Sequence, residues 1–125
     1  MSNFMNDVST MQVTSSLAMS QEASGGLICI RGSHLGQMIP LPGDKVFLFG
    51  RDATTCAYVL NDIQVSRVHC EITFVPALGK YRVKDLSSNG TYLGDGTRLE
   101  RDKEYYLPPA TELYMGNGDN LYKFR

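Results

Sequence analysis

The chain has 125 residues, enough to bury one hydrophobic core but too few for two of ordinary size. Its 12 Lys and Arg residues nearly balance 13 Asp and Glu residues, giving a formal net charge of -1. Neither nucleic acid nor a membrane is therefore an expected partner, since there is no overall positive charge and no run approaches the roughly 20 apolar residues that span a bilayer. Any anion-binding site must be local.

The first 26 residues are rich in Ser, Thr, Met, Asn and Gln, and they end in Ser24-Gly25-Gly26. This composition predicts a flexible tail over residues 1–26 and one domain over residues 27–125. The tail has no basic start followed by an apolar run, so it does not predict export.

From Leu27 onward, short runs of Val, Ile, Leu, Phe and Tyr alternate with clusters of Gly, Asp, Asn and Pro. Apolar and polar residues alternate from Val68 to Phe74, as in a strand with one buried face. The pattern predicts an all-β fold, an antiparallel β-sandwich of two sheets. The predicted strands are Leu27–Arg31, Lys45–Gly50, Tyr58–Leu60, Val68–Phe74, Tyr81–Asp85, Thr91–Leu93, Glu104–Leu107, Glu112–Met115 and Asn120–Phe124.

The three cysteines, Cys29, Cys56 and Cys70, cannot all pair within one chain. They also lack the Cys-x-x-Cys or Cys/His spacing of a zinc site. We therefore expect a reducing, cytoplasmic location, no bound metal and no other cofactor.

Polar residues that could bind a ligand or take part in a reaction gather in three segments between strands: Gly50-Arg51-Asp52, Val65-Ser66-Arg67-Val68-His69 and Ser87-Ser88-Asn89-Gly90-Thr91. Loops at one end of a sandwich lie side by side, so these segments can converge on one ligand. A phosphate dianion is bound by several donors at once, and Arg51, Ser66, Arg67 and Ser88 supply guanidinium and hydroxyl donors.

The order Gly50-Arg51, then Ser66 and His69 with two residues between them, then Asn89-Gly90 resembles the forkhead-associated (FHA) domain. The resemblance covers about Leu27 to Arg125. Each motif alone is weak, but their joint order and spacing are specific. The resemblance implies a sandwich of the FHA/SMAD type. It also implies a non-catalytic module that binds a phosphothreonine-containing protein or peptide in Ser/Thr-kinase signalling.

The resemblance also implies a role for each residue of the site. Arg51 and Ser66 would hold the phosphate, Ser88 would add a hydroxyl, and Arg67 would be a second cation. Asn89 would bind the peptide backbone.

The remaining positions of the site would brace the loops or select the ligand. Gly50, His69 and Gly90 would have structural roles, with a positive φ expected at Gly90. Gln64, Gly94 and Asp95 fall where such domains select the residue three places after the phosphothreonine. The sequence predicts no oligomeric state.

The sequence offers two alternatives to phosphopeptide binding. Ser66, His69 and Asp85 include the residue types of a hydrolase triad, but no Gly-x-Ser-x-Gly turn or strand-to-helix pattern accompanies them. The stronger alternative is a structural FHA-like scaffold, as in some bacterial secretion-system components, which would not depend on phosphate.

The predicted tail contains two possible phosphoacceptors, Thr10 and Thr14, which are followed three positions later by Val13 and Leu17. Some FHA domains accept aliphatic residues at that position, so the tail is a possible ligand of its own domain. A passive leader or linker explains the same residues.

Overall fold

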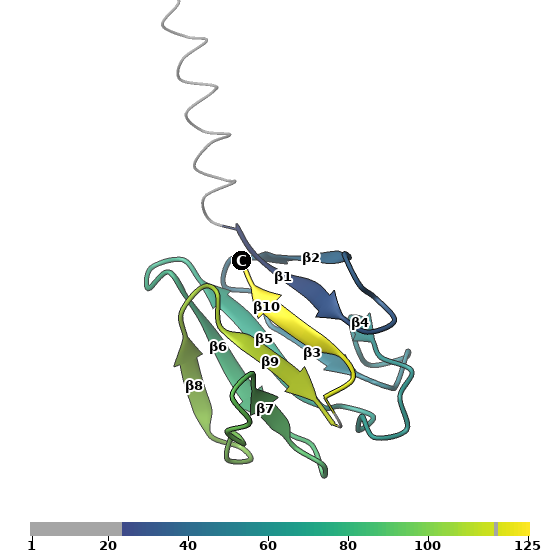
Figure 1. Ribbon diagram of the computed structural model, residues 1–125. Coiled ribbons are helices and arrows are strands. Elements are labelled where there is room, and N and C mark those ends of the chain that lie inside the picture. The colour runs from purple at the N-terminus through teal and green to yellow at the C-terminus, as the bar shows by residue number, and fades with distance from the viewer. Residues whose placement is uncertain (1–23, 117) are drawn as a thin grey trace, which may run out of the picture.

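The computed structural model describes residues 24–116 and 118–125, which form two packed β-sheets (Figure 1). One sheet has the strand order β2-β1-β10-β9-β7 and the other β4-β3-β5-β6-β8. Neighbouring strands are antiparallel except β3 and β4, which are parallel. The predicted all-β sandwich is confirmed. The strands are β1 Ser24–Arg31, β2 Met38–Pro42, β3 Phe47–Gly50, β4 Tyr58–Val59, β5 Cys70–Val75, β6 Lys80–Asp85, β7 Thr91–Leu93, β8 Glu104–Leu107, β9 Glu112–Met115 and β10 Leu121–Phe124.

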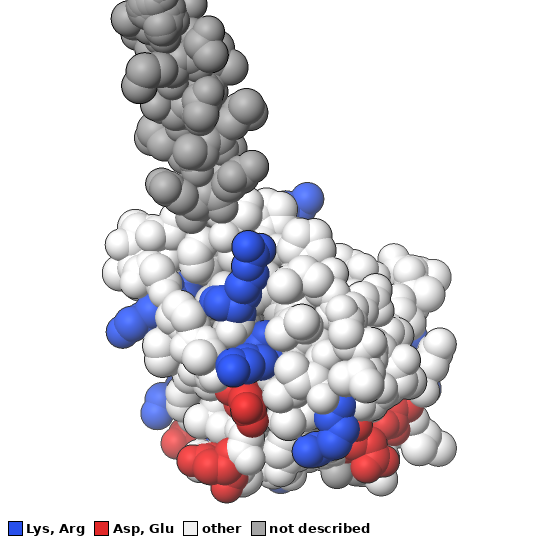
Figure 2. Space-filling view, turned by 45° about the horizontal axis from the view of Figure 1, so that its top comes forward, with Lys and Arg blue, Asp and Glu red and all other residues white. Residues whose placement is uncertain are grey.

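The core lies between the sheets and follows the predicted alternation. In β5, Cys70, Ile72 and Phe74 are buried, and they pair with Asp85, Val83 and Tyr81 of β6. Within the described part of the chain, no helix is long and apolar enough to cross a membrane. On the face shown in Figure 2, Lys and Arg groups lie among uncharged surface, and Asp and Glu groups lie toward the lower edge, some of them beside basic groups.

The first strand begins at Ser24, three residues earlier than predicted, so the expected flexible junction at Ser24-Gly25-Gly26 was wrong. These residues pair with Pro42, Leu41 and Pro40 of β2. Gly25 packs against aromatic rings of the other sheet, where an added Cβ would lie 2.6 Å from Phe74 Cγ and 2.7 Å from Tyr81 Cε2. Gly25 therefore allows close packing of the two sheets rather than chain flexibility.

The second strand, β2, was not predicted, because Pro40 and Pro42 interrupt its apolar residues. Proline lacks the N–H that an interior strand needs, but an edge strand can accommodate it. Here β2 is the edge of its sheet.

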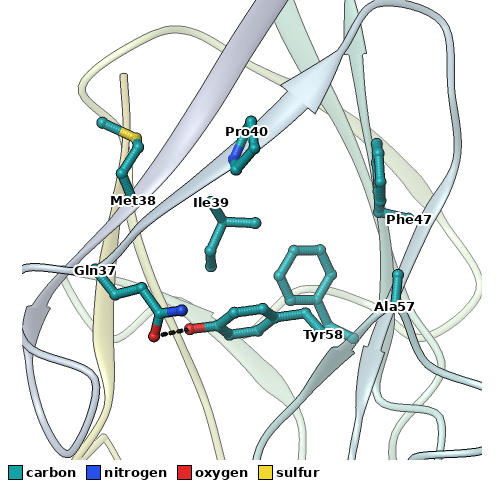
Figure 3. Close-up of a pocket in the computed structure, with 8 residues that line it drawn as sticks. Gln37, Met38, Ile39, Pro40, Phe47, Ala57 and Tyr58 are labelled. Atoms are coloured by element: carbon teal, nitrogen blue, oxygen red, sulfur yellow. Dashed lines mark hydrogen bonds between the residues drawn. The ribbon is translucent and has the colours of Figure 1, made fainter.

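An apolar hollow of about 260 Å³ opens on the flank between β2 and the β3–β4 pair (Figure 3). Tyr58 crosses its floor and donates a hydrogen bond to Gln37 Oε1 at 3.1 Å. The hollow shares no residue with the predicted phosphate-binding set. Its lining residues are Gln37, Met38, Ile39, Pro40, Phe47, Phe49, Ala57 and Tyr58.

Tyr81 ties the two sheets together near the chain's C-terminal end. Its ring stacks on Phe124 with a centroid separation of 4.1 Å. Its buried hydroxyl accepts a hydrogen bond from Gly26 N at 3.1 Å and donates one to Arg125 O at 3.0 Å.

Replacing Tyr81 with Phe should preserve the ring stack but leave the buried Gly26 N–H without its partner. An orphaned buried donor costs about 1–3 kcal/mol, so urea titration should show a free energy of unfolding lowered by that amount. Tyr106→Phe is the matched control, because Tyr106 is 44% exposed. Equal stabilities for the two variants would contradict this role of the hydroxyl.

Candidate phosphate-binding site

The loops that follow β3, β4 and β6 meet at one end of the sandwich, at the lower right of Figure 1. Arg51 joins the first two loops: its backbone N donates to Ser66 O at 3.0 Å, and its side-chain Nε donates to Val65 O at 2.9 Å. The remaining guanidinium nitrogens have no hydrogen-bond partner within the described residues. Arg51 is therefore fixed at its Nε while its outer edge stays exposed.

Gly50 permits this close approach of the loops. A Cβ at Gly50 would lie 2.8 Å from the Arg67 carbonyl carbon and 2.9 Å from Cys56 Sγ, and closer still to the Arg67 oxygen. Because these neighbours include backbone atoms, a larger residue would push the loops apart. The predicted structural role of Gly50 thus has a steric basis.

The neighbouring carboxylate of Asp52 is occupied by its own loop. Oδ1 accepts hydrogen bonds from Thr54 N and Thr54 Oγ1, and Oδ2 accepts one from Thr55 Oγ1. These bonds, with that from Thr54 N first, lower the pKa of Asp52. Among the described residues the one ion pair is Lys103–Glu100, so neither Arg51 nor Arg67 forms a salt bridge, although the charge of Arg67 also lowers the pKa of Asp52.

His69 connects the β4–β5 loop to the β6–β7 loop and is fully buried. Ser66 N lies 3.0 Å from Nδ1, and Gly90 O lies 2.9 Å from Nε2. A backbone N–H can only donate and a carbonyl only accept, so Nδ1 accepts and the proton is on Nε2. Burial lowers the pKa of His69, outweighing the opposing effects of the Gly90 bond and of the Asp85 and Asp62 charges.

This arrangement places the two predicted serines side by side. Ser88 N donates to Ser66 Oγ at 3.1 Å, which leaves the Ser66 hydroxyl hydrogen free to point elsewhere. The Ser88 hydroxyl is exposed and has no partner among the described residues. Arg51, Ser66 and Ser88 therefore belong to one bonded cluster whose outward donors are unused.

Asn89 and Gln64 are also in contact, because Asn89 Nδ2 donates to Gln64 O at 2.9 Å. Arg67 is exposed on the same loop as Ser66, and its carbonyl accepts hydrogen bonds from Asp52 N and Cys56 Sγ. Gly90 has the expected positive φ, 100°.

The other predicted residues lie elsewhere. Gly94 and Asp95 follow the far end of β7, where Gly94 N bonds to Glu112 O, so they are separated from Gln64 by the length of that strand. Thr10 and Thr14 lie outside the described residues.

A buried polar network beneath the β6–β7 loop was not predicted as part of the site. Asp85 Oδ1 accepts hydrogen bonds from Ser87 Oγ at 2.6 Å and Thr91 Oγ1 at 2.7 Å, and Ser87 Oγ accepts one from Gly90 N at 2.8 Å. Asp85, Ser87 and Thr91 are all buried. The pattern of small polar residues around Asn89-Gly90 indicated a turn, but not a carboxylate underneath it.

The same contacts bear on the hydrolase alternative. Both ring nitrogens of His69 bond to backbone groups, and Asp85 Oδ1 bonds to Ser87 and Thr91. No hydrogen bond joins the Ser66 hydroxyl to His69, or His69 to Asp85, among the described residues. Ser66, His69 and Asp85 thus lack the relay of a catalytic triad.

The family model of the FHA domain matches residues 47–116, which include all three loop segments. The chain belongs to the FHA domain family. FHA domains are generally non-catalytic binding modules.

The chain is similar to two curated proteins over part of their length. It is 33% identical over 114 residues to the meiosis-specific serine/threonine-protein kinase MEK1 of Saccharomyces cerevisiae, covering 82% of this chain and 23% of the kinase. It is 29% identical over 97 residues to the human nuclear inhibitor of protein phosphatase 1, covering 77% of this chain and 27% of that protein. The chain spans about a quarter of the length of these relatives.

Solved FHA domains have the same fold. The MEK1 FHA domain in complex with the HOP1 pThr318 peptide matches with a TM-score of 0.66 and 30% identity, over 80% of this chain and 93% of that chain. The N-terminal FHA domain of S. cerevisiae Rad53p in complex with a phosphothreonine peptide matches with a TM-score of 0.67 and 27% identity, over 80% of this chain and 90% of that chain.

The neutral, buried state of His69 predicts a pH dependence of stability. Its folded pKa lies below its ordinary value of 6.5, so below that pH the unfolded state binds more protons. The contribution of His69 to the free energy of unfolding is therefore fully present above about pH 6.5. As the pH drops below that value, the free energy of unfolding decreases by up to ~1.4 kcal/mol per pH unit, until the folded pKa is reached.

An NMR titration of the imidazole signals measures this pKa directly. The chain has 2 histidines, so a His34→Gln variant assigns the remaining ring signals to His69. Their midpoint should lie below 6.5, the ordinary value. A midpoint at or above that value would contradict the neutral bridge.

Proposed function

We propose that this FHA domain binds a phosphothreonine-containing segment of a protein partner and catalyses no reaction. The observation that carries the proposal is the cluster of Arg51, Ser66 and Ser88. Arg51 and Ser88 are exposed and Ser66 is half-buried; the three residues lie on three loops, are joined by hydrogen bonds and have unused donors. The phosphothreonine peptides bound by the similar MEK1 and Rad53p domains support this ligand for the chain.

In this proposal Arg51 and the two serine hydroxyls bind the phosphate oxygens through charge-assisted hydrogen bonds. Arg67, exposed and without an ion pair within the described residues, adds positive charge. Asn89 binds the peptide backbone through its side-chain oxygen, since its Nδ2 is engaged with Gln64 O. Gly50, His69 and Gly90 hold the loops.

Selection along the peptide is assigned to Gln64, Gly94 and Asp95. Gln64 lies beside Asn89, whereas Gly94 and Asp95 would contact a residue further from the phosphate. We propose a cytoplasmic role in Ser/Thr-kinase signalling, where the three buried cysteines Cys29, Cys56 and Cys70 stay reduced.

Titration with a phosphothreonine peptide library, alongside unphosphorylated and phosphoserine copies, tests the proposal. Each charge-assisted bond contributes about 1.5–3 kcal/mol, so the selected peptide should bind in the micromolar range, near -8 kcal/mol. Arg51→Ala should weaken binding at least ~10-fold, and Ser66→Ala should also weaken it. Arg82→Ala, on β6, is the matched control and should bind like the unaltered chain.

A chain lacking residues 1–23 should be tested in parallel, to exclude occupation of the site by the tail. If this shortened chain binds no peptide in a phosphate-dependent way, the phosphothreonine proposal fails and the scaffold alternative gains support. Equal affinity for Arg51→Ala and Arg82→Ala would instead show that phosphate is bound elsewhere.

The tail itself is proposed as one ligand, through Thr10 or Thr14. Ser24 lies ten positions after Thr14, a contour of at most about 36 Å. The eight residues of β1 span about 26 Å from the tail to the loop end. A phosphorylated Thr14 is thus within reach of its own site.

Phosphorylation of Thr10 or Thr14 should weaken binding of an external phosphopeptide more than ~10-fold, because a tethered ligand acts at roughly millimolar effective concentration. The control is a Thr10→Val, Thr14→Val chain treated with the same kinase. Fluorescence anisotropy at several protein concentrations distinguishes two cases. Binding of the tail to its own domain does not depend on protein concentration, whereas binding of the tail to the domain of another copy does. Unchanged affinity after phosphorylation would rule out self-inhibition.

A further inference from the structure

A hairpin outside the three motif loops holds the β6–β7 loop from its side. The chain turns at Asp95-Gly96 after β7, and Arg98 pairs back against Tyr92. Arg98 Nη2 donates to Ser88 O at 3.2 Å, and the Tyr92 hydroxyl donates to Asn89 O at 2.9 Å. The carbonyls of the two loop residues proposed to contact the ligand are therefore both held by this hairpin.

The hairpin can approach the loop because residue 90 is glycine. An added Cβ there would lie 2.7 Å from Arg98 Nε and 2.9 Å from Tyr92 Cε1. The guanidinium also lies over the Tyr92 ring, 5.8 Å from its centroid, and Tyr92 stacks on Tyr114 at 5.1 Å. Arg98 is thus positioned by a hydrogen bond and a ring contact rather than by a carboxylate.

The positive charge of Arg98 has no protein counter-ion within residues 24–116 and 118–125. Arg98 is exposed, and one of its five N–H donors is used in the bond to Ser88. The two acidic residues nearest to it along the chain are engaged elsewhere: Asp95 accepts a hydrogen bond from Thr97 N, and Glu100 pairs with Lys103. The β6–β7 loop, Leu86-Ser87-Ser88-Asn89-Gly90, carries no charge of its own.

We propose that Arg98 is a specificity-determining residue that selects an acidic side chain in the ligand, close to the phosphothreonine. The inference rests on the proposed function, because it needs a peptide lying across Ser88 and Asn89. A carboxylate there would meet a pre-positioned guanidinium whose remaining donors suit a carboxylate. Gln64, the other selecting residue at Asn89, is neutral, so Arg98 supplies the charge discrimination.

A peptide series separates charge selection from simple bracing of the loop. A single Asp is moved through the three positions on each side of the phosphothreonine, and each peptide has an Asn-containing twin. The unaltered chain should prefer Asp over Asn about fivefold at one or more positions, the upper range for an exposed ion pair. The preference should shrink as salt is raised.

Two variants at this position complete the test. Arg98→Gln keeps a donor for Ser88 O but removes the charge, so the Asp peptides should be weakened more than their Asn twins and the Asp preference should disappear. Arg98→Lys keeps the charge and should retain part of the preference. Arg82→Gln is the control for loss of an arginine elsewhere and should leave the preference intact.

The outcomes also separate this inference from the proposed function. No Asp preference in the unaltered chain, a preference that survives Arg98→Gln, or equal weakening of Asp and Asn peptides by Arg98→Gln would each overturn it. In those cases, phosphate- and Arg51-dependent binding of the Asn peptides would leave the proposed function standing. Loss of phosphate dependence in the unaltered chain would refute both.

Discussion

The buried imidazole of His69 lies between two loops that come from different parts of the chain. It accepts a hydrogen bond from Ser66 N and donates one to Gly90 O. A neutral imidazole with its proton on Nε2 can do both, whereas an imidazolium could only donate. The contact between Ser88 N and Ser66 Oγ forms between the loops that this bridge joins, so the geometry of the site depends on His69 remaining uncharged.

Around this bridge, most of the polar groups that shape the loops bond to one another, although Asp85 Oδ2 is buried without a hydrogen-bond partner among the described residues. The Asp85 carboxylate supports the β6–β7 loop from below, the Asp52 carboxylate is bonded within its own loop, and Arg98 and Tyr92 hold the loop carbonyls from the side. This arrangement leaves the outward donors of Arg51, Ser66 and Ser88 without protein partners among the described residues. A site organised in this way needs little rearrangement to receive an anion.

Much of the fold was predictable because local patterns and tertiary packing agree. The alternation around Cys70, Ile72 and Phe74 indicated a strand with one buried face, and it forms β5. Prediction of strands failed where the local preference of a glycine or proline was overridden by contacts with residues far away in the sequence. Gly25 and Gly26 indicated flexibility but lie in β1, where Gly25 packs against Phe74 and Tyr81 and Gly26 N donates to the Tyr81 hydroxyl. Pro40 and Pro42 argued against a strand, yet β2 is an edge that tolerates them.

For the site, the sequence by itself determined which residue types are available: an arginine after a glycine, serines and a histidine at set spacing, and an Asn-Gly turn. Only the tertiary structure decided how they meet, because Arg51, Ser66 and Ser88 lie on three loops whose separation depends on sheet packing. It also decided that Asp85 lies beneath the turn, that Arg98 folds back onto Ser88, and that Gly94 and Asp95 lie at the far end of β7 from Gln64. These contacts join residues across strands and turns, and no local pattern in the chain encodes such distances.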